Sequence, residues 1–307
     1  MSRMDDLASR LASARAGAAV GPALRRGILR FTGKDRLAYL HRMSTQNLAP
    51  LGPGHSAYAA FLEAKGHLVA EGTVLARQDE VLVDVDPLAL EAARAHLSMF
   101  VIMDDVTVED LSGRLEVVPA FGPGGVAVAR SRAGAAPSAE NARRGAPCLD
   151  VYLPSGEADA FRESLLAAGA APLTETDLEV LRIEEGIPRF GADMDAERLP
   201  MEAGLTRSAI HFGKGCYVGQ EVVLRATVRG HLQRGLVQLS LPPGAQPGAR
   251  LTAAGADVGW VTSAAETTKG RLGLGYVRRA HWKEGARLGT DGGEAVVRRV
   301  IVHEGTQ

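Results

Sequence analysis

Two cysteines, Cys148 and Cys216, are all that this sequence of 307 residues contains. Two cysteines cannot form a disulfide framework, and they lack the grouped Cys and His spacing of a structural zinc site. We therefore expect a reducing compartment, no bound metal and no stable iron–sulfur cluster held by the chain itself. No run of about 18 apolar residues occurs, and the charged start of the chain lacks the apolar core of a signal peptide. These absences predict a cytoplasmic protein that makes no membrane contact.

The sequence also lacks an excess of charge of either sign. Lysine and arginine total 35 residues, against 36 for aspartate and glutamate. No global electrostatic field therefore draws the protein toward nucleic acid or membrane, and any charged patch must be local. Hydrophobic residues make up 46% of the chain, which is enough to fill the two or three packed units that its length predicts.

The first half of the chain alternates helical and strand patterns. Thr32 and Asp35 are spaced as a capping box, which predicts a helix from there to about Ser44. His41 in that helix has no partner four residues on, so we interpret it as a surface residue rather than a ligand. The other segments expected here are a peripheral helix over 5–16, strands over 27–31, 57–62, 68–76 and 80–85, a helix over 87–99, and strand character over 101–111.

The second half is expected to contain more strand. We predict two short strands within 115–129 around a glycine-rich turn, and an exposed loop over 130–147. Cys148 then opens a strand to residue 153 as a structural residue, and a helix covers 157–168. Thr174 and Asp177 form another capping box, which begins a helix over 175–185. Short strands follow over 236–241, 250–253, 258–263, 271–277 and 295–302.

The stretch 214–221, KGCYVGQE, gives its cysteine an unusual setting. Lys214 precedes Cys216 by two residues, and a short helix is expected to begin near Gly219 with its positive end toward the sulfur. Both features favour the thiolate, which is the nucleophilic form. The alternative is that Cys216 is an inert, buried small hydrophobe, and spacing alone leaves both interpretations open.

The octapeptide resembles the K-G-C-(F/Y)-x-G-Q-E signature of the YgfZ family of folate-binding proteins. That family is related to the T-protein, the aminomethyltransferase of the glycine cleavage system, and the similarity extends roughly from Gly27 to Arg279. The resemblance implies a functional pair, Cys216 and Lys214, with Tyr217, Gln220 and Glu221 beside the cofactor. It also implies a role in the synthesis or repair of iron–sulfur enzymes, and through them in tRNA modification.

A second segment, LRIEEGIPRFG over 181–191, is similar to the LRLEAGLxLYG segment of the T-protein. Glu184 falls at the end of its helix, where a carboxylate opposes the dipole, so it is a candidate for function or for a pair with an arginine. The resemblance implies that Glu184 binds the pterin of tetrahydrofolate, with Arg182 and Glu202 as further cofactor-binding residues. A carboxylate can accept two parallel hydrogen bonds from a pterin.

One departure from the T-protein concerns its G-G-x-x-D-D hairpin. The present chain has Ala70 and Glu71 where that enzyme has its acid pair. Loss of a carboxylate removes a group that handles a proton or orients a cofactor nitrogen, so aminomethyl transfer is not expected. Whether the protein is an enzyme at all stays open at this point.

The motif is followed by a basic stretch that contains Arg225, Arg229, His231 and Arg234. A solvated helix face explains most such stretches. The alternative is a funnel for an anion, either a polyglutamate tail of folate or a phosphate of tRNA. No aromatic residues are interleaved to stack bases, so the sequence gives little support to an RNA-binding module.

These patterns, together with what the resemblance implies, predict an α+β fold. Residues 1–20 form a helical segment, and 21–234 form a folate-binding body of two related subdomains, each an antiparallel sheet covered by helices. Residues 235–307 form a C-terminal antiparallel β-barrel, as the resemblance implies. The expected function is that of a tetrahydrofolate-binding accessory protein with iron–sulfur enzymes as partners. The alternatives are an active aminomethyltransferase and a non-catalytic scaffold for RNA or protein.

Overall fold

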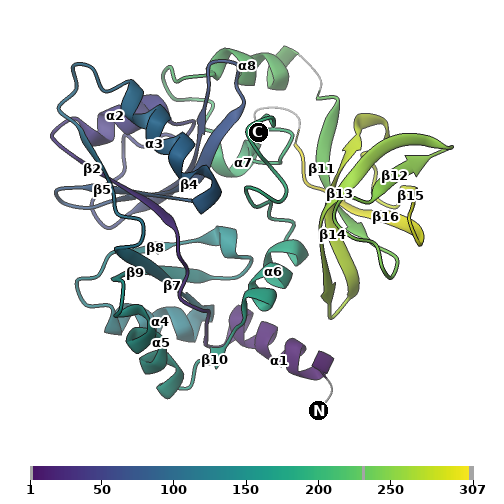
Figure 1. The fold of residues 1–307 in the computed structure, drawn as a ribbon, viewed down its shortest axis with the longest axis horizontal. Helices are drawn as coiled ribbons and strands as arrows, with labels where there is room; N and C mark the ends of the chain where they lie inside the picture. Colours follow the sequence, from purple (N-terminus) through teal and green to yellow (C-terminus); the bar gives the residue numbers. More distant parts are fainter. Residues whose placement is uncertain (1–2, 230–231, 304–307) are drawn as a thin grey trace.

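The computed structural model describes residues 3–229 and 232–303 and has three parts (Figure 1). Two five-stranded sheets, one above the other, form the body, and a closed six-stranded barrel lies beside them. This arrangement confirms the predicted α+β fold. Among the described residues, no helix combines the length and apolar character needed to cross a bilayer.

The first sheet is an antiparallel meander in the order β3-β4-β5-β2-β6. Leucine, valine and aromatic side chains from its inner face pack against α2 and α3 in one large core. The elements are β2 (Gly27–Thr32), α2 (Arg36–Met43), β3 (Ser56–Leu62), β4 (Leu68–Ala76), β5 (Val81–Val85), η1 (Pro87–Ala89), α3 (Leu90–Met99) and β6 (Thr107–Asp110).

Two expectations for this part were wrong in detail. Thr32 is the last residue of β2, and Asp35, at the start of α2, makes no side-chain cap hydrogen bond. The Asp35 carboxylate instead accepts the Asp105 N–H at 2.9 Å, so a tertiary contact replaces the local one. Strand structure begins only at Thr107, and residues 101–106 before it form bends without regular structure.

The second sheet has the order β10-β1-β7-β9-β8, and α4 and α5 cover it. Its β1 strand precedes the first sheet in the chain, so the predicted N-terminal segment 1–20 ends inside the second sheet. The elements are α1 (Arg3–Ala16), β1 (Ala19–Val20), β7 (Leu115–Phe121), α4 (Gly122–Arg132), β8 (Ser138–Glu140), η2 (Ala142–Arg144), β9 (Cys148–Pro154), α5 (Ala158–Ala167) and β10 (Ala171–Pro172).

The strand expected after Phe121 is wrong, because α4 occupies that position. Gly122 begins the helix with φ 72°, and its Cα approaches the Gly17 carbonyl so closely that an added Cβ would lie 2.4 Å away from that oxygen. Glycine is the residue that tolerates this conformation. The expected exposed loop over 130–147 is also wrong in part, since β8 and η2 lie within it.

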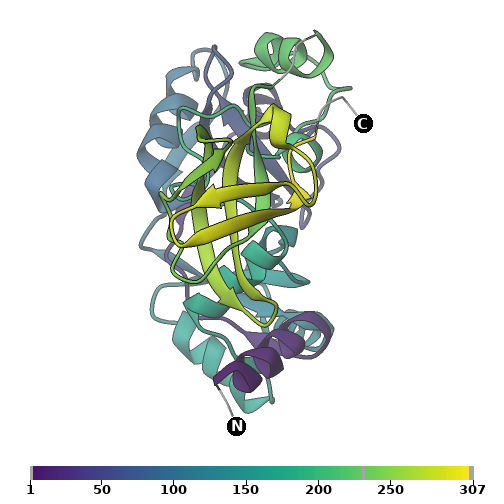
Figure 2. The same cartoon turned by 90° about the vertical axis from the view of Figure 1, so that its right-hand side faces the viewer.

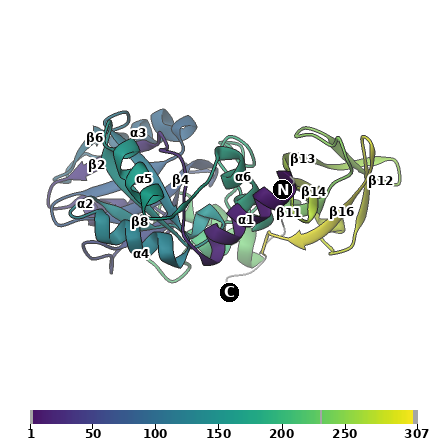
Figure 3. The ribbon, with the colours of Figure 1, turned by 90° about the horizontal axis from the view of Figure 1, so that it is seen from below.

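The two sheets face each other through a third apolar layer. Ile28, Leu75 and Leu82 of the first sheet pack against Val117 and Tyr152 of the second. Helix α6 (Glu175–Glu184) then leads from the body toward the barrel, and Figure 3 shows α1 and α6 between the two parts. The capping box of α6 is confirmed, since Thr174 and Asp177 each accept from the other's backbone N–H. Such a cap contributes about 1 kcal/mol to helix stability.

Between α6 and the barrel the chain returns to the first sheet and forms α7 (Thr206–Ala209), α8 (Gln220–Leu224) and a π-helical turn (Arg225–Arg229). The barrel faces the viewer in Figure 2. It closes in the order β11-β14-β13-β12-β15-β16 around an apolar interior. Its strands are β11 (Arg234–Ser240), β12 (Arg250–Ala253), β13 (Ala256–Thr267), β14 (Gly270–Arg278), β15 (Arg287–Thr290) and β16 (Gly293–Val300), with η4 (Arg279–His281) between.

Candidate functional site

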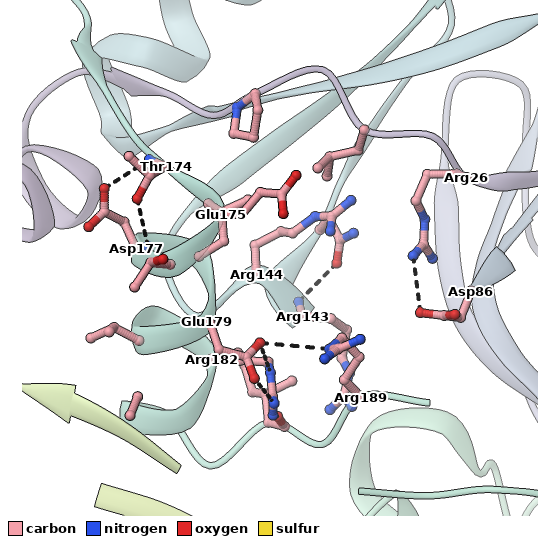
Figure 4. A pocket seen from close by; sticks show the side chains of 18 of the residues that line it. Arg26, Asp86, Arg143, Arg144, Thr174, Glu175, Asp177, Glu179, Arg182 and Arg189 are labelled. Carbon is pink, nitrogen blue, oxygen red and sulfur yellow. Dashed lines mark hydrogen bonds and ion pairs between the residues drawn. The ribbon is translucent and has the colours of Figure 1, made fainter. Parts of the chain in front are cut away.

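A large cavity, with a volume of about 1720 Å³, lies where all three parts of the molecule meet. Its walls come from α1, the edge of the first sheet, the η2 turn, α6 and residues 264–266 of the barrel. Figure 4 shows Glu175 and Glu179 of α6 opposite arginines of the η2 turn and of the segment after α6. Cavities at the junction of domains are common ligand sites.

The charges around this cavity are balanced. Eight arginines and eight carboxylates line it, so the wall offers positive and negative charges in equal number rather than one sign of charge. A polar ligand with both kinds of group suits such a wall better than a polyanion. These residues are Arg10, Arg25, Arg26, Arg143, Arg144, Arg162, Arg182, Arg189, Glu71, Asp86, Glu116, Asp159, Glu175, Asp177, Glu179 and Glu266.

One corner of the cavity contains a polar group without a partner. The Tyr58 hydroxyl is buried and makes no hydrogen bond within the part of the chain that the structure describes. The Arg143 guanidinium lies over the Tyr58 ring at 4.6 Å from its centre. Burial raises the pKa of Tyr58 well above its ordinary value, Arg143 opposes that rise, and Glu71 adds to it. The corner therefore presents a neutral hydroxyl, a carboxylate and a cation to a ligand.

Sequence reasoning missed Tyr58 and Arg143. Arg143 lies in the segment interpreted as an exposed loop, and Tyr58 lies at a strand position that resembles any other aromatic on a sheet. The sequence signal that could have found Tyr58 was the hairpin that carries Glu71, because Ala60 of β3 pairs with Glu71 of β4. Residues that neighbour Glu71 across the hairpin were therefore candidates from the predicted meander alone.

Arg182 lines the cavity, but its guanidinium is largely occupied. It is 6% exposed and donates to Glu179, to Asp193 at 2.7 Å and to Ser263 of the barrel at 2.7 Å. Glu179 also lies 3.7 Å from Arg189. Arg182 thus joins α6 to the barrel and holds Glu179 at the cavity wall.

Glu184 lies apart from the cavity wall. Helix geometry turns it to the side of α6 opposite Arg182 and Glu179, and it is absent from the lining residues. Its side chain is fully buried and pairs with Arg15 of α1. The other carboxylate oxygen, Oε1, has no hydrogen-bond partner in residues 3–229 and 232–303. Glu184 therefore makes the arginine pair and still retains one free acceptor.

The KGCYVGQE stretch lies at the end of the first sheet that is distant from α6 (Figure 1), and none of its residues lines the cavity. Cys216 is exposed, whereas Tyr217 is buried in the first core. Gly219 has φ 81°, and an added Cβ would lie 2.7 Å from the Glu63 carbonyl of the β3–β4 hairpin. The cysteine is thus presented outward on a loop that is packed against the body.

The Lys214 ammonium is buried beneath this loop. It donates to the main-chain carbonyls of His41, Ser44 and Gln46, and it lies 5.1 Å from the centre of the Tyr217 ring. Burial lowers the pKa of Lys214 to about 8. Burial also raises the pKa of Tyr217 to about 12, so the ring stays neutral.

The other predicted cofactor-binding residues are dispersed. Glu221 is exposed and pairs with Arg225, and Gln220 is half-buried at the start of α8. Glu202 is half-buried between α6 and α7, where desolvation raises the pKa of its carboxyl. The structure therefore brings Lys214, Cys216, Tyr217, Gln220 and Glu221 together on one loop, but separates that loop from Arg182 and Glu184.

Two arginines of the basic stretch after the motif have partners in the described part of the chain. Arg225 is paired with Glu221, and Arg234 lies over the Trp260 ring at 5.4 Å. His231 lies outside the described residues, and the side chain of Arg229 is likewise not described. Within the described chain, no group of three or more His, Cys, Asp or Glu residues is arranged to hold a metal ion.

The arrangement of two helix-covered sheets, a barrel and a central cavity defines a protein of aminomethyltransferase fold. Aminomethyltransferase T of the glycine cleavage system from Bartonella henselae superposes with a TM-score of 0.83, covering 97% of this chain and 90% of that chain at 21% identity. At that identity the likeness shows the fold alone.

Sequence comparison goes further. An aminomethyltransferase from Rubrobacter xylanophilus is 30% identical over 275 residues, which are 82% of this chain and 73% of that protein. The chain therefore belongs to the aminomethyltransferase family, in the superfamily of the glycine cleavage T-protein, and the resemblance stated from the sequence is confirmed at that level. No family model matches the chain.

Other relatives in this superfamily have different names. A chloroplastic protein of Arabidopsis thaliana, named as a transferase, is 26% identical over 275 residues, with 82% of this chain and 63% of that protein covered. A mitochondrial iron–sulfur cluster assembly factor IBA57 homologue from Phaeosphaeria nodorum is 26% identical over 238 residues, with 73% and 56% covered. The chain thus spans less than two thirds of the length of these two relatives.

Proposed function

We propose that this protein binds a reduced folate in its central cavity and supports the assembly or repair of iron–sulfur enzymes, and through them tRNA modification. The observation that carries the proposal is the outward-facing thiol of Cys216 on a loop fixed to the body. Relatives named as iron–sulfur cluster assembly factors support this role, and Ala70 in place of an acid weighs against aminomethyl transfer. In this proposal the protein has two functional sites, the central cavity and the exposed Cys216 thiol.

The residues present at the cavity fit a folate. Its volume of about 1720 Å³ exceeds that of most small-molecule pockets. The unpartnered Tyr58 hydroxyl and the Glu71 carboxylate would meet the polar edge of a pterin, and Arg143 would offer its planar cation to an aromatic ring or a carboxylate. A bound reduced folate supplies a carrier for a one-carbon group. The residues of this chain would orient it and exclude water.

Glu184 also stays a proposed folate ligand. Its Oε1 atom is a buried acceptor without a partner, and such atoms are rare enough in folded proteins to need an explanation. The competing explanation is that Glu184 serves only to bind Arg15. Glu179, which lies on the same helix and lines the cavity, is then the α6 carboxylate available to a ligand.

Titration with tetrahydrofolate distinguishes these two carboxylates. We expect binding, and we expect Glu184→Ala to weaken it by about 2 to 3 kcal/mol, the usual loss for a charge-assisted hydrogen-bonded partner. Calorimetry measures the affinity, and thermal unfolding of the same samples shows whether the fold is retained. Glu179→Ala tests the alternative carboxylate of the same helix. If that variant loses affinity and Glu184→Ala does not, Glu184 is a structural partner of Arg15.

Aminomethyl transfer is not expected even with folate bound. The first position of the acid pair is Ala70, which is fully buried, and Glu71 is the one carboxylate of β4 that faces the cavity. Supplied with the other components of the glycine cleavage system, the protein should show no turnover above background. An Ala70→Asp, Glu71→Asp double variant is the comparison. Robust turnover by the unmodified protein would show that Glu71 alone suffices for aminomethyl transfer. Aminomethyl transfer would then be the preferred function.

A scaffold that binds RNA is the weaker alternative. The arginines proposed to contact tRNA are Arg225, Arg229 and Arg234. Two of these already have partners in the structure: Arg225 pairs with Glu221, and Arg234 lies over Trp260. No observation on the described surface favours a tRNA contact through them.

A further inference from the structure

Lys214 occupies a site that is built like a small cation-binding cage. Its Nζ atom donates to the Ser44 carbonyl at 2.6 Å, to the Gln46 carbonyl at 3.1 Å and to the His41 carbonyl. These oxygens come from the last turn of α2 and the segment that follows it. The negative end of the α2 dipole adds to the attraction for a cation. The lysine is 8% exposed, so the cage is largely closed to water.

The match between donors and acceptors is complete. A lysine ammonium has three N–H donors and no acceptor, and each donor here has a carbonyl oxygen. The ammonium is thus fully engaged with main-chain groups about 170 residues away in sequence. Its three donors are thus directed at α2 and the segment that follows it, rather than at the Cys216 sulfur.

The loop is also fixed on the other side of the cysteine. Tyr217 packs in the first core, and Val223 of α8 is fully buried there. Gly219 approaches the Glu63 carbonyl too closely for any side chain. Gly215 and Cys216 lie between the anchor at Lys214 and the anchor at Tyr217. An added Cβ at Gly215 would meet no atom within 4 Å, and Cys216 is exposed. The thiol is thus the exposed point of a short span that is tied at both ends.

We propose that Lys214 is a positioning residue, which holds the Cys216 loop to α2 by filling a carbonyl cage rather than activating the thiol through its charge. This inference rests on the proposed function only in treating Cys216 as a functional thiol. It replaces the expectation, drawn from spacing, that a positive charge at residue 214 is what the cysteine requires. Arginine would then be no substitute, because its planar fork cannot converge on three oxygens as an ammonium does.

The test compares three substitutions at Lys214 with a nearby control. Alkylation of Cys216 by iodoacetamide is followed by mass spectrometry, and cleavage after Tyr217 by chymotrypsin reports release of the loop. We expect Lys214→Arg and Lys214→Met to agree within about twofold and both to change the alkylation rate by about fivefold or more, since neither fits the cage. Cleavage after Tyr217 should rise in both. Lys65 is exposed on the adjacent hairpin and does not hold the loop. Lys65→Met removes its charge and should resemble the wild type.

Chemical rescue gives a readout that a general loss of packing would not give. In Lys214→Ala, propylammonium replaces the missing atoms, and it should restore both the wild-type alkylation rate and the protection of Tyr217. Propanol at the same concentration, which lacks the charge, should restore neither. Rescue by both compounds alike would mean that the site needs volume only and would overturn the proposal.

Two further outcomes would overturn the inference. If Lys214→Arg retains the wild-type alkylation rate while Lys214→Met is slow, charge activates the thiol. If all three variants match the wild type in both assays, the cage does not hold the loop. Neither outcome bears on folate or iron–sulfur enzymes, so failure here is distinct from failure of the proposed function.

Discussion

Iodoacetamide should alkylate Cys216 at least about a hundredfold faster than Cys148 in the folded protein, because exposure and thiolate fraction together control the rate. Cys216 is exposed, while Cys148 is 5% exposed and lies on β9 in the body. Burial raises the pKa of Cys148 well above its ordinary value, and the Asp150 carboxylate, 3.6 Å from its sulfur, adds to that rise. Labelling followed by mass spectrometry at several pH values between 7 and 8.5 measures both rates.

Denaturant provides the control for this experiment. In about 6 M guanidinium chloride, which unfolds most domains, the two cysteines should label at similar rates. Equal labelling in the folded protein would show that the second sheet opens readily around Cys148. Labelling of Cys216 only after denaturation would mean that the cysteine is buried in solution and that the motif serves structure.

The same residue carries the functional test. Cys216→Ser should leave the fold intact, because an exposed loop side chain contributes little packing. It should nevertheless abolish support of iron–sulfur enzymes in cells that lack the native protein. Cys148→Ala, which keeps Cys216, is the comparison and should complement. Full complementation by Cys216→Ser would remove the thiol from the proposed function.

Local sequence patterns predicted most of the elements for identifiable reasons. The Thr174 and Asp177 cap lies directly before its helix, so the hydrogen bonds that define it are local. The meander of the first sheet follows from short links between alternating strands. In contrast, α4 begins with GPGG, a sequence that disfavours helices. It forms because Gly122 and Gly124 allow α4 to pack closely on the segment that follows α1, a contact that no local pattern shows.

The candidate site was less predictable because its geometry depends on contacts between distant residues. Spacing placed Lys214 near Cys216, but the carbonyls that bind the ammonium belong to residues 41–46. Periodicity placed Glu184 at a helix end, but only the packing of α1 decides that Arg15 faces it. The barrel shows the same limit, since β15 has the sequence RLGT, with one buried residue and a glycine, and it is a strand because it pairs with β16.

The largest stability effect is expected at Asp193, which joins α6 to the barrel. Its carboxylate accepts from Arg182 at 2.7 Å, from the Arg189 N–H at 3.1 Å, from Ser263 at 2.8 Å and from Thr262. The side chain is fully buried. Asp193→Ala leaves Arg182 and the two hydroxyls without that partner inside the protein, which typically costs about 3 to 5 kcal/mol of unfolding free energy. Urea unfolding followed by circular dichroism measures the loss.

Asp195→Ala is the matched control, because Asp195 is 55% exposed and its contact with Arg198 is 3.9 Å long. Removal of such a surface pair should change the unfolding free energy by less than about 1 kcal/mol. The comparison also decides whether the buried Asp193 carboxylate joins α6 to the barrel. If Asp193→Ala costs no more than the control, this carboxylate is not needed for that junction. A large cost shows that the hydrogen bonds from Arg182, Ser263 and Thr262 to Asp193 hold α6 against the barrel.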